Sequence, residues 1–235
     1  MPSIATRLET VRRRIREAEK AANRELGSVT LLAVSKMQPV DALQQAIAAG
    51  QREFGENYLQ EAADKQDALA DATDLHWHFI GPLQSNKTKP AAARFDWVHS
   101  VDRLKLARRL DGQRPEGLPP LNVCLQVNIS GESSKAGLSP ADTETLAGEM
   151  LQFDRLRLRG LMAIPAPASD PEKQRQPFRA LRELLDRLNQ RFPLHMDTLS
   201  MGMSADLEAA IAEGATIVRV GTDVFGPRPD PATTA

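Results

Sequence analysis

Eight short apolar runs recur along the sequence, and amphipathic stretches separate them. The runs are the expected strands, and they lie at 30–35, 52–54, 76–80, 96–99, 121–129, 156–164, 196–201 and 216–220. Apolar residues at helical spacing fill the gaps, at 40–49, 58–71, 86–94, 103–110, 140–152, 172–191 and 204–213. Strands that alternate with helices pair in parallel, and eight such units in 235 residues predict an α/β fold, a single (β/α)8 TIM-like barrel. A doubly wound open sheet is the alternative, although no Gly-x-Gly-x-x-Gly motif follows the first strand.

An additional N-terminal helix is expected before the first strand. Residues 3–26 carry apolar side chains at helical spacing, and Gly27 is a common type of helix end. No stretch has the composition of a linker between domains. We therefore expect one domain over residues 1–228, followed by a flexible C-terminal tail over the proline-rich residues 229–235.

The charge and hydropathy of the chain argue against several classes of partner. The 30 Lys and Arg residues balance 31 Asp and Glu residues, so neither a nucleic acid nor an anionic membrane is expected to bind. No run approaches the roughly 18 consecutive apolar residues that cross a membrane, and the N-terminus has no apolar signal core. A cytoplasmic location is therefore expected. Cys124 is the single cysteine, so no internal disulfide is expected.

Lys36 directly follows the first expected strand, in the stretch "LLAVSKMQPV". The chemistry of a (β/α)8 barrel lies at the carboxyl ends of its strands, and Lys36 falls at that end. One interpretation is an ordinary surface lysine at a strand end. The other is a Schiff-base lysine, because a partly apolar pocket lowers the pKa of an amine and makes it nucleophilic at neutral pH.

The last two expected strands end in loops suited to a phosphate group. Barrels often bind phosphate with the loops that follow strands seven and eight. Ser200 lies at the end of strand seven, Gly202 and Ser204 follow it, and Ser204 is expected to be the N-cap of the next helix. Gly221 and Thr222 offer the same chemistry after strand eight. Each residue alone is a normal turn residue, but together they fall where a phosphate pocket is expected.

An amine opposite a phosphate pocket suggests a phosphorylated aldehyde as ligand. Pyridoxal 5′-phosphate fits, and so does the sugar phosphate of a class I aldolase. Arg219 helps to discriminate, because strand alternation places Arg219 and Gly221 on the same face of the eighth strand. An inward arginine can bond the pyridine nitrogen, and because arginine stays protonated that nitrogen is held unprotonated.

The motifs along the chain resemble those of the YggS/PROSC-type pyridoxal phosphate homeostasis proteins. The matching stretches, in order, are "LLAVSK", "FGENY", "WHFIGPLQSNK", "LNVCLQVNIS", "SKAGL", "LRGLMAIPAP", "DTLSMGMSADLEAAI" and "VRVGTDVFG". The resemblance implies the barrel domain of alanine racemase, a fold-type III pyridoxal phosphate barrel, without the second, β-rich domain of that enzyme. The chain stops soon after the eighth strand, so no such domain is expected.

The resemblance also implies cofactor roles for individual residues. It makes Lys36 the lysine of the internal aldimine and places Arg219 on the pyridine nitrogen. Ser204, Gly221 and Thr222 are implied to hold the phosphate.

Further residues match the family with less specific roles. Asn57 is implied to line the cofactor and Ser200 to contact it nearby, and Lys135 matches a second lysine near the pocket mouth, a secondary pyridoxal phosphate site. An ordinary loop residue is the other interpretation of Asn57 and of Lys135. The family often reads Ser-Lys-Thr-Lys-Pro after the first strand, whereas Met37 and Gln38 stand here, so the second basic residue is missing.

The favoured function is a cofactor-binding protein of pyridoxal phosphate homeostasis. It holds the cofactor as a lysine aldimine and hands it over, transiently, to apo-enzymes, with little or no turnover and as a monomer. A pyridoxal-phosphate-dependent racemase and a class I lysine aldolase are the alternatives. A racemase needs an acid/base group on each face of the cofactor, and nothing in the sequence places Tyr58, the one tyrosine, opposite Lys36.

The four histidines give no metal site. His76 and His78 share one strand face, but no third ligand is evident, so packing or hydrogen bonding is expected. His99 and His195 have no evident partner in the sequence.

Overall fold

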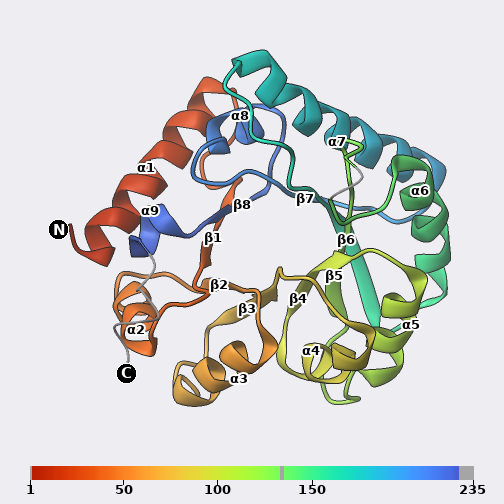
Figure 1. Cartoon of the computed structure of the whole chain (residues 1–235), viewed down its shortest axis with the longest axis horizontal. Helices are drawn as coiled ribbons and strands as arrows, with labels where there is room; N and C mark the ends of the chain where they lie inside the picture. Colours follow the sequence, from red (N-terminus) through yellow and green to blue (C-terminus); the bar gives the residue numbers. More distant parts are fainter. Residues whose placement is uncertain (1, 133–134, 228–235) are drawn as a thin grey trace.

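Eight parallel strands close into a barrel in the computed structural model, which describes residues 2–132 and 135–227 (Figure 1). Each strand pairs with its neighbour in sequence, and β8 pairs with β1 to close the ring. The predicted (β/α)8 barrel is therefore confirmed. The strands are β1 (Thr30–Val34), β2 (Glu53–Glu56), β3 (His76–Phe79), β4 (Trp97–Val101), β5 (Leu121–Gln126), β6 (Leu156–Met162), β7 (Thr198–Ser200) and β8 (Ile217–Val220).

Helices surround the barrel on its outer face (Figure 1). Polar caps mark where several of them begin: Ser3 and Ser139 accept hydrogen bonds from backbone N–H groups, and Asp170 does the same just before Pro171. The helices are α1 (Ile4–Ala21), α2 (Val40–Ala48), α3 (Leu59–Ala68), α4 (Thr88–Arg94), α5 (Leu104–Gln113), α6 (Pro140–Glu149), α7 (Pro171–Arg191), α8 (Leu207–Ala212) and α9 (Thr222–Phe225), with 3-10 turns η1 (Ser85–Lys87) and η2 (Met150–Gln152).

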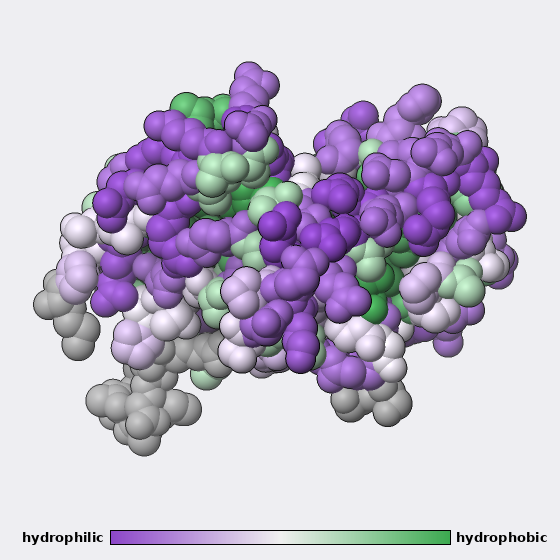
Figure 2. Space-filling model, turned by 90° about the horizontal axis from the view of Figure 1, so that it is seen from above, coloured by the Kyte–Doolittle hydropathy of each residue, from purple (hydrophilic) through white to green (hydrophobic). Residues whose placement is uncertain are grey.

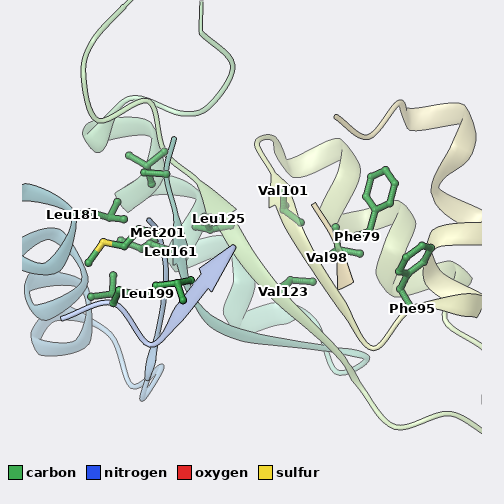
Figure 3. Close-up of a cluster of buried hydrophobic side chains, with 14 of the residues drawn as sticks. Phe79, Phe95, Val98, Val101, Val123, Leu125, Leu161, Leu181, Leu199 and Met201 are labelled. Carbon is green, nitrogen blue, oxygen red and sulfur yellow. The ribbon is translucent and has the colours of Figure 1, made fainter. Parts of the chain in front are cut away.

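The hydrophobic core lies between the strands and the surrounding helices. Figure 3 shows Leu181 of α7 facing Leu161 and Leu199 of the barrel, and both Leu161 and Leu181 are fully buried. Full burial of one such side chain stabilises the fold by about 1.5–3 kcal/mol. The face of the molecule drawn in Figure 2 is mostly hydrophilic, with small apolar patches between the polar side chains. None of the described helices is long and apolar enough to span a membrane.

The N-terminal helix is shorter than the predicted 3–26. Helix α1 ends at Ala21, because Asn23 takes a left-handed backbone conformation with φ 53°. Glu19 is fully buried in the last turn and accepts hydrogen bonds from the backbone N–H groups of Gly27 and Val29. This carboxylate ties the turn after the helix to the start of β1, so the chain reaches the barrel without further helix.

The expectation that Ser204 caps the helix at 204–213 is wrong. Helix α8 begins at Leu207, and its N-cap is Asp206. The Asp206 carboxylate accepts from the backbone N–H of Met203 at 2.6 Å, so residues 203–206 form a turn before the helix. Helix α9 was not expected, and the predicted strand 52–54 extends to Glu56. The predicted tail 229–235 and residue 228 lie outside the described residues.

Candidate functional site

A cavity of about 310 Å³ opens at the carboxyl ends of the strands, where the barrel reading places the chemistry. Loops after β1, β2, β3, β6, β7 and β8 contribute to its wall. The lining residues are Val34, Lys36, Gln38, Asn57, Ile80, Ile164, Met203, Ser204, Ala205, Arg219, Gly221, Thr222 and Gly226. Six residues proposed from the sequence therefore meet in one cavity: Lys36, Asn57, Ser204, Arg219, Gly221 and Thr222.

Ser200 and Lys135 do not line this cavity. Ser200 is fully buried, and its hydroxyl lies 2.8 Å from Arg219, so it contacts a lining residue. Lys135 Nζ lies 3.0 Å from Glu132 Oε1 and 3.5 Å from the carbonyl oxygen of Ile164, which is a lining residue. Lys135 thus stands beside the rim of the cavity.

Lys36 is positioned by a buried group of charges that we call the Lys65 cluster: Ser35, Glu56, Glu61 and Lys65. The Lys65 ammonium donates to the Ser35 carbonyl at 2.6 Å and to one oxygen each of Glu56 and Glu61 at 2.7 Å. The Ser35 hydroxyl donates to Glu56 at 2.6 Å. Ser35, the residue just before Lys36, is therefore held through both its backbone carbonyl and its side-chain hydroxyl.

The backbone after Lys36 is held by the same cluster. Met37 has φ 60°, a left-handed conformation that is uncommon for residues other than glycine. Its N–H donates to Glu61, which compensates for the local strain. Burial raises the pKa of Glu56, although the ammonium of Lys65 and the Ser35 hydroxyl oppose the shift.

The loops after β7 and β8 form the side of the cavity expected to hold a phosphate. Helix α9 begins at Thr222, and the first turn of a helix leaves its N–H groups without partners inside the helix. A Cβ atom at Gly221 would lie 3.2 Å from the carbonyl oxygen of Val34, so a residue without a side chain lets β8 end close to β1. Ser204 supplies a hydroxyl from the turn before α8.

Arg14 of α1 connects the two loops. Its guanidinium donates to the carbonyl oxygen of Ser204 at 2.9 Å and to the Asp223 carboxylate at 2.7 Å. It also forms a two-point ion pair with Glu208 of α8 at 2.8 and 3.1 Å. The additional N-terminal helix therefore braces, from outside, the side of the cavity that the loops after β7 and β8 form.

Arg219 closes the floor of the cavity and is 4% exposed. It donates to the carbonyl and hydroxyl oxygens of Ser200 and to the carbonyl oxygen of Ala163. A guanidinium has five N–H donors, and these contacts within the described part of the chain use three of them. Burial lowers the pKa of Arg219 to about 10, so the side chain stays charged at neutral pH.

Asn57 lines the cavity from the loop after β2. Its Oδ1 atom is buried and has no hydrogen-bond partner among the described residues. The Asn57 backbone packs against Gly81, where an added Cβ atom would lie 2.2 Å from the Asn57 carbonyl oxygen. Gly81 is a residue that sequence reasoning missed, and its position in "HFIGPL" after β3 was the available signal.

Two expectations about polar residues are settled by the geometry. His99 does have partners, since its ring nitrogens lie 2.9 Å from His78 and 2.8 Å from Ser200. His78 is hydrogen-bonded as expected, whereas His76 is exposed. No group of three metal-ligating side chains exists among the residues that the structure describes.

Comparison with known proteins agrees with this geometry. Residues 6–229 match the family described as "Alanine racemase, N-terminal domain". The pyridoxal phosphate homeostasis protein of Pseudomonas aeruginosa is 61% identical over 228 residues and 97% of each chain is covered. The protein of the same name from Escherichia coli K12 is 52% identical over 230 residues, covering 97% of this chain and 98% of its own.

Solved structures show the same relationship. PipY of Synechococcus elongatus, solved with pyridoxal phosphate bound, is 42% identical with a TM-score of 0.85, and the match covers 95% of this chain and 100% of PipY. The fold and the cavity thus define a barrel of the alanine racemase N-terminal type. Within that class, the chain belongs to the family of pyridoxal phosphate homeostasis proteins.

Proposed function

We propose that this protein binds pyridoxal phosphate in the 310 Å³ cavity and holds and hands over this cofactor in its cellular homeostasis, with little or no turnover. The observation that carries the proposal is the meeting of a lysine amine, a buried arginine and two phosphate-type loops in one cavity. The names of the relatives and the bound pyridoxal phosphate in PipY support the same ligand.

The residues present fit this cofactor. Lys36 supplies the amine for the aldehyde, and Ser204, Gly221 and Thr222 supply hydroxyl and N–H donors for the phosphate. The Oδ1 atom of Asn57, which has no hydrogen-bond partner among the described residues, is the proposed acceptor for a donor group of the ligand. Bound pyridoxal phosphate supplies an aldehyde carbon that amines attack and a ring that withdraws electrons.

Arg219 is proposed to face the ring nitrogen. Its two N–H groups not used by Ser200 and Ala163 are the donors for that contact. Because Arg219 keeps its own proton at neutral pH, it holds the ring nitrogen in its unprotonated form.

The cavity wall favours binding over catalysis. Among the described lining residues none is His, Tyr, Cys, Asp or Glu, so no general base stands opposite Lys36. Tyr58 does not line this cavity; it is 56% exposed and lines a neighbouring groove. The cavity is therefore less suited to a racemase. If the protein were an aldolase, the buried Arg219 would have no role.

Apo-enzymes that need pyridoxal phosphate are the proposed transient recipients, and Lys135 beside the rim is the proposed secondary site on the exit route. We propose that the protein acts as a monomer and in the cytoplasm.

Borohydride reduction tests the proposal directly. The purified protein loaded with pyridoxal phosphate is expected to be yellow, and reduction should fix one pyridoxyl group on the peptide that contains Lys36. The Lys36→Ala variant should lose this label, whereas Lys135→Ala should keep it. A protein that stays colourless with added cofactor, or a label found only at Lys135, contradicts the proposal.

A further inference from the structure

A chain of hydrogen bonds crosses the barrel interior from Arg219 to Glu53. Ser200 Oγ lies 2.8 Å from the Arg219 guanidinium and 2.8 Å from His99 Nδ1. His99 Nε2 lies 2.9 Å from His78 Nδ1, and His78 Nε2 lies 2.7 Å from Glu53 Oε2. The three middle residues are at most 1% exposed, whereas the Glu53 side chain is 28% exposed. Glu53 lines a second cavity, of about 350 Å³, at the amino end of the strands.

Arg219 and Glu53, at the two ends of this series of hydrogen bonds, require the same donor-to-acceptor direction along it. A guanidinium only donates, so Ser200 Oγ accepts from Arg219 and has its own proton to give to His99 Nδ1. An ionised carboxylate only accepts, so the His78 Nε2 atom that faces Glu53 carries a proton. Burial lowers the pKa of both histidines, so each ring is neutral with one N–H. Both rings are therefore protonated on Nε2 and accept on Nδ1.

We propose that Ser200, His99, His78 and Glu53 act as positioning residues that hold the Arg219 guanidinium in one orientation toward the cofactor. The inference rests on the proposed function, because it gives the orientation of Arg219 a purpose. The Ser200 hydroxyl donates its proton to His99, so the lone pairs of Ser200 Oγ are left to accept from Arg219. Two carbonyl groups complete the cradle, and the donors left over are those that a ligand in the cavity can use.

A role in packing alone does not account for this arrangement. Barrel interiors are usually filled by branched apolar side chains, and a buried polar network is favourable only when every member is satisfied. Here each ring nitrogen of both histidines has a partner within 2.9 Å. Trp97 stacks on the His78 ring with the planes 5° apart, which fixes the plane in which the hydrogen bonds lie.

Nitrogen NMR of the histidine rings tests the direction of the chain without any cofactor. In protein labelled with ¹⁵N-histidine at neutral pH, His78 and His99 should each show a neutral ring with a protonated Nε2 and an unprotonated Nδ1. The His76→Gln variant removes a neighbouring exposed histidine and should leave both signals in place. An imidazolium, an Nδ1–H tautomer or a rapid mixture at either ring overturns the inference.

Cofactor affinity tests the consequence for Arg219. Ser200→Ala removes one hydrogen bond to the guanidinium and should weaken pyridoxal phosphate binding roughly three- to tenfold. Ser100→Ala is the matched control, since Ser100 is 2% exposed on β4 and its Oγ has no hydrogen-bond partner among the described residues. His99→Leu should weaken binding as Ser200→Ala does. His99→Gln should bind close to wild type, because an amide can accept from Ser200 and donate to His78.

The two experiments separate this inference from the proposed function. If the wild-type protein binds no pyridoxal phosphate, the proposed function fails, and the ring tautomers still decide whether the directed chain exists. If the wild type binds but Ser200→Ala, Ser100→Ala and His99→Leu all match it, the positioning role is refuted. Rescue by His99→Gln together with loss in His99→Leu supports it, because a change in packing alone would not follow hydrogen-bonding capacity.

Discussion

Replacing Lys65 with methionine is expected to destabilise the protein, because the buried Glu56 carboxylate loses the ammonium group that neutralises it. The Lys65 side chain is 5% exposed and that of Glu56 is fully buried. In the variant, the Ser35 hydroxyl is the one described partner that Glu56 keeps. Removing one member of a buried ion pair costs about 3–5 kcal/mol. For a domain of this size, each kcal/mol lowers the melting temperature by about 2–4 °C, so a fall of roughly 6 °C or more is expected.

The loss should depend on pH in a defined direction. Burial already raises the pKa of Glu56 above its usual value of 4.5, and removing the Lys65 ammonium raises it further. A carboxyl with a raised folded-state pKa favours the folded state below its unfolded pKa, and this contribution disappears as the pH rises through the folded pKa. The deficit of Lys65→Met relative to wild type should therefore be small near pH 4.5 and grow toward pH 8.

Urea unfolding at several pH values measures this deficit, and a second substitution isolates its cause. Glu56→Gln added to Lys65→Met removes the stranded charge and should recover much of the stability at pH 8. Lys89→Met, at an exposed lysine of α4, is the control and should change little. A deficit that is the same at pH 5 and pH 8 and is not relieved by Glu56→Gln refutes the reasoning.

Three further substitutions test the cavity, each by pyridoxal phosphate binding. Thr222→Asp puts a like charge beside the phosphate and should weaken binding about tenfold or more, with pyridoxal much less affected; equal loss of both ligands would indicate general damage. Gln38→Lys adds a cation to the cavity wall and should tighten binding about threefold at low salt, and an unchanged affinity would show that residue 38 lies too far from the phosphate. Arg14→Ala releases the loop at Ser204 and should speed cofactor loss, whereas Arg16→Ala, which pairs with Glu9 on the same helix, should not.

The fold could be predicted from the sequence because the apolar runs of its strands and the apolar spacing of its helices can both be recognised there. Strands buried on both faces read as apolar runs, and the helices between them keep their apolar spacing. The predicted ends of helices were less accurate where a side-chain hydrogen bond determines where the helix begins. Ser204 and Asp206 are both acceptable helix caps in the sequence. The helix starts after Asp206 because this carboxylate bonds the Met203 N–H, a contact that no periodicity contains.

The position of the site was predictable because a barrel gathers its strand ends. That rule brought residues as far apart as Lys36 and Thr222 to one cavity wall. The polar chain below the cavity was not predictable, since His99 and Ser200 are 101 residues apart and meet across the barrel interior. Lys65 was equally hidden, because a lysine in an amphipathic helix normally points to solvent. Its burial depends on where Glu56 lies at the end of β2.

The chemistry of the cavity leads to one more expectation, that the loaded protein exchanges the α-proton of amino acids far more slowly than a racemase does. Arg219 has a pKa of about 10, so it keeps its proton at neutral pH, and in the proposed contact it would donate to the ring nitrogen without protonating it. A ring held this way is a weaker electron sink, and no described lining residue can act as a base opposite Lys36. Each 1.36 kcal/mol of missing transition-state stabilisation slows the reaction about tenfold. Incubation with single L-amino acids in deuterated water, followed by NMR and chiral analysis, measures the exchange. Turnover on the order of one per second would overturn the carrier function, whereas cofactor transfer to an apo-enzyme without such exchange supports it.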